Sequence, residues 1–340
     1  MVIDRLIEQI KNKKNPCIVG IDSEWSKIPE CYITNTVTEA ENILHWATDV
    51  IDAVADIVPA VKPQMAFFEV FGAEGVRVHQ QVIQYAHNKG LVVIDDSKRN
   101  DIGNTAKAYA YAHLAKKGPI NADFMTVSPF LGTDSIQPFI DMSIKEEKGT
   151  FVLVKTSNPS STEISDATNA HGEKIRDWLA SYIHTIGKNC VGKYGYSNIG
   201  AVVGATFPEE AYLLRNIMKN NLFLVPGFGA QGGKAKDIVP CFNEDGLGAI
   251  VSSSRGILYK HLDVAEYNGT KNMYVEIVKN QAKNMQQLVY KELSRNYPNK
   301  QRRSVSSSRT AKSVYGHGLR YGAGLRHDRM RPQNFHSRPQ

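Results

Sequence analysis

Eight short apolar runs are the feature that most constrains the fold of this 340-residue chain. They read CIVGID (17–22), IVPAVK (57–62), LVVIDD (91–96), DFMTV (123–127), FVLVKT (151–156), IGAVV (199–203), LFLVP (222–226) and GAIVS (248–252). None of the runs strictly alternates apolar with polar residues, which is typical of strands buried on both faces in a parallel sheet.

Helical patterns lie between these runs. Apolar residues spaced along one helix face are Ile43, Trp46, Ala47, Val50 and Val54, then Val78, Val82, Tyr85 and Ala86, and finally Val278, Ala282, Met285 and Leu288. Eight β/α units predict an α/β fold, the (β/α)₈ TIM barrel. The alternative is an open doubly wound sheet, but the glycine-rich G-x-G-x-x-G turn expected after its first strand is absent from GIDSEWSKIPE (20–30).

The net charge of +7 comes from the C-terminal 40 residues. Residues 301–340 hold nine Lys and Arg against one Asp, which leaves 32 basic and 33 acidic side chains in residues 1–300. The segment 296–340 is rich in Arg, Ser, Gly and His and poor in aliphatic residues, which predicts disorder. We therefore predict a single catalytic barrel domain over residues 1–295 and a disordered basic tail over 296–340. Only the tail carries a signal for nucleic-acid binding.

The cysteines and the N-terminus bear on the cellular setting. Cys17, Cys31, Cys190 and Cys241 show no C-x-x-C spacing, which favours neither a zinc site nor a disulfide framework and indicates a reduced compartment. The first residues lack the apolar stretch of a signal peptide, and no run of about 18 apolar residues occurs. No histidines are paired at metal-binding spacing. We predict a cytoplasmic protein without a metal site and with neither nucleic acid nor a membrane as a partner.

In a TIM barrel the active site lies at the carboxyl ends of the strands, where this chain places charged residues. Asp96, Lys98 and Asp101 follow the third run, LVVI. A lysine between two carboxylates keeps its proton, so it can act as a general acid and as a cation facing a developing anion. The alternative interpretation is a charged helix start, with Asp101 or Asn104 as the cap and Lys98 in solvent.

Two further loops indicate a phosphate site. PGFGAQGG (226–233) follows the seventh run and SSSRG (252–256) follows the eighth, where TIM barrels commonly bind phosphate. Glycines let backbone N–H groups approach an anion closely, and Arg255 carries a permanent charge. The sequence therefore predicts a phosphate ester as substrate. Taken singly, the first motif could be a tight turn and Arg255 a solvated side chain.

The string DSKRNDIGNT (96–105) resembles the catalytic motif of orotidine 5′-phosphate decarboxylases, particularly their longer bacterial-type branch. Five other strings match that family in order: VGID (19–22), VKPQMAFFE (61–69), VKTSNPSS (154–161), VPGFGAQGG (225–233) and VSSSRGI (251–257). The resemblance spans about residues 3–295 and stops before the tail. It implies a homodimer of TIM barrels that converts orotidine 5′-monophosphate to uridine 5′-monophosphate and carbon dioxide without metal or organic cofactor.

The same resemblance implies a role for each matching residue. Lys62, Asp96, Lys98 and Asp101 would form a charged array in which Lys98 protonates C6 and Asp101 reaches into the partner's site. Asp22 and Lys62 would hold the ribose hydroxyls with Asp101 and Thr105, Ser157 would contact the pyrimidine, and Gly229, Gln231, Ser254 and Arg255 would bind the phosphate. Seen alone, Asp22 could be a strand-end cap, Lys62 a snorkelling lysine and Ser157 a turn former.

Two other functions remain as alternatives. The Mg²⁺-dependent 3-hexulose-6-phosphate synthases and 3-keto-gulonate-phosphate decarboxylases share the D-x-K-x-x-D barrel and the phosphate loops. The strings K-R-x-D-I-G-x-T, T-S-N-P and PGFGAQGG favour the orotidine enzyme over them. A nucleic-acid-binding protein acting through its basic tail is a hypothesis of a different class, and deletion of residues 301–340 would test it.

Overall fold

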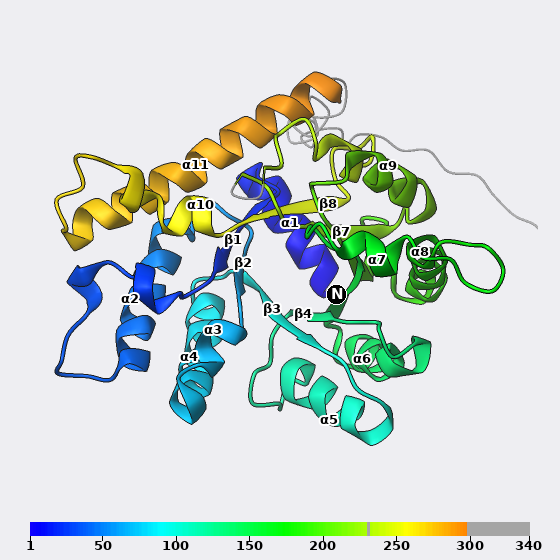
Figure 1. The fold of residues 1–340 in the computed structure, drawn as a ribbon, viewed down its shortest axis with the longest axis horizontal. Coiled ribbons are helices and arrows are strands. Elements are labelled where there is room, and N and C mark those ends of the chain that lie inside the picture. Colours follow the sequence, from blue (N-terminus) through cyan, green and yellow to red (C-terminus); the bar gives the residue numbers. More distant parts are fainter. Residues whose placement is uncertain (230–231, 298–340) are drawn as a thin grey trace, which may run out of the picture.

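The computed structural model describes residues 1–229 and 232–297 and shows eight parallel strands closed into a barrel in sequence order (Figure 1). The strands are β1 (Cys17–Ile21), β2 (Ala60–Pro63), β3 (Val92–Arg99), β4 (Phe124–Val127), β5 (Gly149–Lys155), β6 (Ser197–Val203), β7 (Asn221–Val225) and β8 (Ala249–Ser253). Pairing of Cys17 with Val251 joins β1 to β8 and closes the ring. The predicted TIM barrel is confirmed, and each predicted run overlaps one strand.

Helices surround the ring of strands (Figure 1). The α-helices are α1 (Val2–Lys13), α2 (Glu39–Val54), α3 (Ala66–Glu69), α4 (Gly72–Asn88), α5 (Gly103–Leu114), α6 (Thr133–Glu146), α7 (Ser161–Ser165), α8 (Ile175–Gly187), α9 (Pro208–Ile217), α10 (Arg255–Leu258) and α11 (Lys271–Asn296). Short 3₁₀ helices are η1 (Trp25–Lys27), η2 (Glu30–Tyr32), η3 (Lys188–Cys190), η4 (Val239–Cys241) and η5 (Lys260–Asp263). Between β7 and β8 the described residues form η4 and no α-helix.

The apolar core has two layers because both faces of every strand are covered. Side chains such as Val92, Ile94 and Phe124 fill the barrel interior, where α1 contributes Leu6 and Ile7 and closes the amino-terminal end. The opposite strand faces pack against the surrounding helices in a second cluster. This double burial explains why the strands appear in the sequence as continuous apolar runs.

The predicted helix faces are buried with two exceptions, Tyr85 on α4, which is only partly buried, and Leu288 on α11, which is exposed. All five predicted residues of α2 are buried, and Thr38 caps this helix with Glu41 in a capping box. The prediction for α11 was wrong at Leu288, which is 54% exposed, whereas Val289 is buried. Eleven residues complete about three helical turns, so Val289 rather than Leu288 lies in line with Val278.

Two further sequence predictions concern the ends and the setting of the chain. Helix α11 ends at Asn296, and Tyr297 after it donates a hydrogen bond to the carbonyl of Val239. Residues 298–340 lie outside the described residues, so the division into a 1–295 domain and a 296–340 tail stays a prediction. Within the described ranges, no helix combines the length and apolar character needed to cross a membrane.

Candidate active site

A pocket of about 420 Å³ opens at the carboxyl ends of the strands. Its charged and polar lining includes Asp22, Lys62, Gln64, Asp96, Lys98, Thr126, Thr156, Ser157, Asn158, Ser252, Ser253, Ser254 and Arg255. Leu153, Val202 and Leu224 add an apolar side. The barrel thus gathers, at one opening, residues that lie up to 233 positions apart in the chain.

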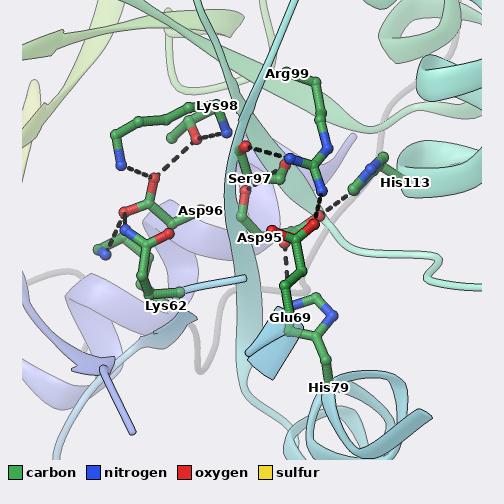
Figure 2. Close-up of polar contacts among 11 residues, drawn as sticks. Lys62, Glu69, His79, Asp95, Asp96, Ser97, Lys98, Arg99 and His113 are labelled. Atoms are coloured by element: carbon green, nitrogen blue, oxygen red, sulfur yellow. Dashed lines mark hydrogen bonds and ion pairs between the residues drawn. The ribbon is translucent and has the colours of Figure 1, made fainter. Parts of the chain in front are cut away.

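The carboxylate of Asp96 is the centre of the polar contacts in this pocket (Figure 2). One oxygen, Oδ2, accepts hydrogen bonds from Nζ of Lys62 at 2.5 Å and from Nε2 of Gln64 at 3.0 Å. The other, Oδ1, accepts from Nζ of Lys98 at 2.6 Å and from Oγ1 of Thr126 at 2.9 Å. Each oxygen therefore has two donors, and two of the four carry a positive charge.

Burial and charge act in opposite directions on this array. Burial by itself would raise the pKa of Asp96, but the ammonium groups of Lys62 and Lys98 more than offset it and lower that pKa below its ordinary value. Burial would lower the pKa of Lys62, yet the carboxylates of Asp96 and Asp22 together raise it. Asp96 and Lys62 are therefore held in their charged forms. Of the two carboxylates that the sequence interpretation places around Lys98, Asp96 contacts its ammonium, whereas Asp101 accepts a bond from the backbone of Ile102.

Lys98 has an unusual backbone for a residue of a strand. Its φ angle is +46°, in the left-handed region that non-glycine residues rarely adopt and that often marks functional sites. The backbone N–H of Lys98 donates to Oγ1 of Thr126 at 2.9 Å, and the same hydroxyl donates to Asp96. Thr126 thus holds both the backbone of Lys98 and the carboxylate that its ammonium contacts.

The opposite end of the pocket holds the predicted phosphate loops. Ser254 and Arg255 line the pocket where α10 begins. A Cβ atom on Gly20 would lie 2.0 Å from Oγ of Ser254, so β1 needs a glycine for this close approach. Gly229 is exposed, with a φ angle of +75°. Gln231, predicted to contact the phosphate, lies outside the described residues.

The structure brings some of the predicted site residues together and leaves others apart. Asp22, Lys62, Asp96, Lys98, Ser157, Ser254 and Arg255 all line the pocket. Asp101 and Thr105 are not part of its lining. Oδ1 of Asp101 accepts a hydrogen bond from the backbone N–H of Ile102 at 2.8 Å, and Thr105 is exposed on the first turn of α5.

Two members of the array were missed in the sequence. Gln64 follows Lys62 by two residues, and Thr126 is the one polar residue within β4. A threonine in an otherwise apolar buried strand was the available signal for the second, because a buried hydroxyl requires a partner. For Gln64 the signal was weaker, since a glutamine after a strand is common at surfaces.

A second pocket, of about 630 Å³, lies at the amino-terminal side of β6 and β7 and includes Tyr196, Arg215 and Asp245 in its lining. The polar groups named here form hydrogen bonds with one another or with the backbone. Arg215 donates to the carbonyls of Gly248 at 2.9 Å and Asn221 at 2.7 Å, and the hydroxyl of Tyr196 donates to Asp245 at 3.0 Å. We therefore assign the chemistry to the smaller pocket.

In the described ranges, no three His, Cys, Asp or Glu side chains are grouped as metal ligands.

Comparisons with known proteins match this arrangement. Residues 16–269 match the model of the "Orotidine 5′-phosphate decarboxylase / HUMPS family". The chain belongs to this family. A relative from Caldicellulosiruptor bescii named orotidine 5′-phosphate decarboxylase is 41% identical over 287 residues, covering 80% of this chain and 94% of the relative. A second with the same name, from Clostridium perfringens strain 13, is 40% identical over 265 residues, covering 77% and 91%.

Solved structures agree with the family assignment. The structure of Leishmania donovani OMP decarboxylase has a TM-score of 0.65 and 28% identity, with 86% of this chain and 98% of that chain covered. A Streptomyces avermitilis structure, whose assignment as an orotidine 5′-phosphate decarboxylase is itself provisional, has a TM-score of 0.73 and 29% identity, with 86% and 95% covered. The predicted family and the predicted class of enzyme, a carboxy-lyase, are thereby confirmed.

Proposed function

We propose that the chain decarboxylates orotidine 5′-monophosphate to uridine 5′-monophosphate and carbon dioxide without a metal or organic cofactor, with Lys98 as the proton donor. The observation that carries the proposal is the Lys98 ammonium 2.6 Å from the buried Asp96 carboxylate, inside a barrel-mouth pocket of the decarboxylase family. Relatives named for this reaction, at 41% and 40% identity over most of the chain, support the choice of substrate.

The array suggests how its residues divide the reaction. A substrate carboxylate placed beside Asp96 meets a like charge, and this contact is relieved when carbon dioxide leaves. The bond from C6 to the carboxyl carbon breaks, and its electron pair stays on C6. The Lys98 ammonium stabilises that pair and then donates a proton to form the new C–H bond. Solvent returns a proton to Lys98, whose side chain is 44% exposed.

Binding roles follow from the positions of the remaining residues. Oδ1 of Asp22 is buried in the pocket and has no hydrogen-bond partner among the described residues, which suits it to accept a bond from a ribose hydroxyl. Lys62 would join it there, and Ser157 would contact the pyrimidine. Ser254 and Arg255 would bind the phosphate, with Gly229 and Gln231 from the preceding loop.

The absence of a metal step is supported by the donors around Asp96. Both of its oxygens already accept two hydrogen bonds, and a divalent cation at this carboxylate would face the ammonium groups of Lys62 and Lys98. The Mg²⁺-dependent sister enzymes need a carboxylate free to bind the metal. The array therefore favours the orotidine enzyme.

We also propose a homodimer in which Asp101 and Thr105 complete the partner's site. Asp101 is only partly buried and does not line the pocket of its own chain. Large apolar side chains are exposed in the segments that follow the neighbouring strands β2, β3 and β4, namely Val70 (72%), Ile102 (57%) and Phe130 (74%). Exposed apolar groups of this size are typical of interaction surfaces.

The primary test follows the ultraviolet absorbance of orotidine 5′-monophosphate added to purified protein, with and without EDTA. We expect turnover that EDTA does not change and that Lys98→Ala abolishes, while the variant still binds uridine 5′-monophosphate. Turnover of a sugar phosphate that requires Mg²⁺, or no turnover by folded protein, would assign the chain to the sister enzymes instead.

The shared site has its own test. Lys98→Ala and Asp101→Asn should each be inactive as separate proteins, but unfolding and refolding them together should restore about a quarter of wild-type activity, because half the dimers then contain one intact site. Failure to recover activity in mixtures shown to contain heterodimers would place Asp101 in its own chain's site.

A further inference from the structure

A second polar cluster lies on the other face of β3, away from the pocket. Neighbouring side chains on a strand point to opposite faces, and Ile94 and Asp96 share the face that turns to the barrel interior. Asp95 therefore points outward between the strands and the helices, where its side chain is 0% exposed. Figure 2 shows the two aspartates on opposite sides of the strand, each with its own set of partners.

Two histidines from different helices enclose the Asp95 carboxylate. Nε2 of His79, from α4, lies 3.2 Å from Oδ1 of Asp95. Nδ1 of His113, from α5, makes a closer contact with Oδ2. Burial alone would raise the pKa of Asp95, but the contacts with His113 and His79 lower it, so the carboxylate remains charged in an apolar layer. An unpaired carboxylate would be very unfavourable there.

The cluster connects three elements that supply the site. β3 carries Asp96 and Lys98 immediately after Asp95, and α5 starts just after Asp101 and carries Thr105 on its first turn. Helix α4 follows β2, the strand that provides Lys62. Asp95 is also among the carboxylates that raise the pKa of Lys62, so its negative charge affects a residue on the other side of the strand.

Buried charged clusters of this kind are weak sources of stability, because an apolar set of similar volume often does as well. In some proteins such clusters fix one arrangement of the elements that they join. The end of β3 needs such fixing, because the left-handed backbone of Lys98 persists only if its surroundings hold it.

We propose that His79, Asp95 and His113 are positioning residues that hold the end of β3 and thereby place Asp96 and Lys98 for the reaction. This inference rests on the proposed function. The three side chains do not contact the substrate. They act through the backbone of β3, which Thr126 braces from the other face through its bond to the N–H of Lys98.

Variants of the histidines separate positioning from general stability. An asparagine amide can replace the Nδ1 group of His113, which hydrogen-bonds to Asp95. A glutamine amide can replace Nε2 of His79, which lies at ion-pair distance from Asp95 without hydrogen-bond geometry. Leucine at either position removes the group that faces Asp95. The matched control is His87→Leu. His87 lies on α4, as His79 does, and its Nε2 atom contacts Asp123 at 3.0 Å at the amino-terminal side of β4.

We expect His113→Leu to lower kcat roughly thirtyfold with KM changed by less than about threefold, and His79→Leu to have a smaller effect because its contact is longer. His113→Asn and His79→Gln should stay within about threefold of wild-type kcat, and so should His87→Leu. If His113→Leu does not fold, Asp95→Asn takes its place with the same expectation. Equal losses in His113→Leu and His87→Leu, or no rescue by His113→Asn, would overturn the proposal.

A structural measurement keeps this test separate from the proposed function. Crystal structures of wild type, His113→Leu and His113→Asn show the position of Asp96 and Lys98 whatever the substrate is. Displacement of both in the leucine variant alone supports positioning, and an unmoved pair refutes it. Lack of orotidine 5′-monophosphate turnover by wild type would instead refute the proposed function.

Discussion

Replacement of Thr126 by valine tests the array through one nearly isosteric change. Thr126 is 1% exposed, and its hydroxyl accepts from the N–H of Lys98 at 2.9 Å and donates to Asp96 at 2.9 Å. Valine removes both bonds and leaves the partly buried N–H of Lys98 without this partner. The lost hydrogen bond to a charged group and the unpaired, partly buried donor together lower the free energy of unfolding by about 2–4 kcal/mol.

The catalytic effect of the same change should exceed what stability alone explains. Without the hydroxyl, the left-handed backbone of Lys98 loses its side-chain anchor, so its ammonium is held less firmly against Asp96. We expect kcat to fall by roughly tenfold or more with KM changed by less than about threefold, because the loss falls on the transition state. Absorbance kinetics and thermal unfolding measure the two effects.

Two matched variants decide the interpretation. Thr126→Ser restores the hydroxyl and should recover most of the lost kcat. Thr150→Val removes another fully buried threonine hydroxyl, bonded to Ser143 at 2.7 Å near the start of β5, and should cost stability without changing kcat. Wild-type kcat in Thr126→Val, or an equal loss of kcat in Thr150→Val, would refute the reasoning.

Three further predictions concern other parts of the molecule. Arg255→Ala should raise KM for orotidine 5′-monophosphate by roughly 10–100-fold, since charge-assisted bonds to phosphate contribute about 1.5–3 kcal/mol, and steady-state kinetics would expose an unchanged KM. Burial would raise the pKa of Asp123, but His87, Arg5 and Lys148 lower it to about 2. Because this folded-state pKa is depressed, its contribution of about 2–3 kcal/mol is present above about pH 4 and is lost as pH falls towards 2, so denaturant unfolding of wild type and Asp123→Asn should converge in acid. Deletion of residues 301–340 should leave kcat unchanged, and a filter or gel assay comparing the two forms tests whether the tail binds nucleic acid.

The barrel could be predicted from the sequence because each buried strand has an apolar pattern that is visible in its own few residues. A strand covered by side chains on one face and helices on the other must be apolar throughout, and this pattern is visible without any long-range information. The helix faces were predicted for the same reason, and the error at Leu288 arose from a register that shifts over a long helix. Position at the end of a run then identified Asp22, Lys62, Asp96 and Lys98 as pocket residues, although Asp101, selected in the same way, does not line the pocket of its own chain.

The rest of the site depends on contacts that no spacing encodes. Thr126 can bond to Asp96 and Lys98 because β4 lies beside β3, which the sequence does not show. The charged string at 95–101 also does not reveal which of its side chains enter the pocket. Once the bounds of β3 are known, alternation along the strand places Asp95 on the opposite face from Asp96. Its partners, however, come from helices 16 residues before and 18 residues after it, and a lone histidine within a helix predicts no contact. Motifs in a sequence therefore identify the residues that touch a substrate before they identify the residues that hold those in place.

The charge balance of the array explains why its geometry must be held so firmly. Lys62, Asp96 and Lys98, the members of the array that one chain supplies, carry one net positive charge, and the partner's Asp101 in the proposed dimer would reduce the total to zero. Either total acts equally on the substrate carboxylate and on a carbanion at C6, because each carries a single negative charge. Net charge alone would thus bind both states alike and give no acceleration. The difference must come from position, because the carboxylate charge lies towards Asp96 and the carbanion charge towards Lys98. A displacement that brought Lys98 closer to the carboxylate would reduce this difference without weakening binding, so damage to the supports of β3 should appear in kcat and not in KM.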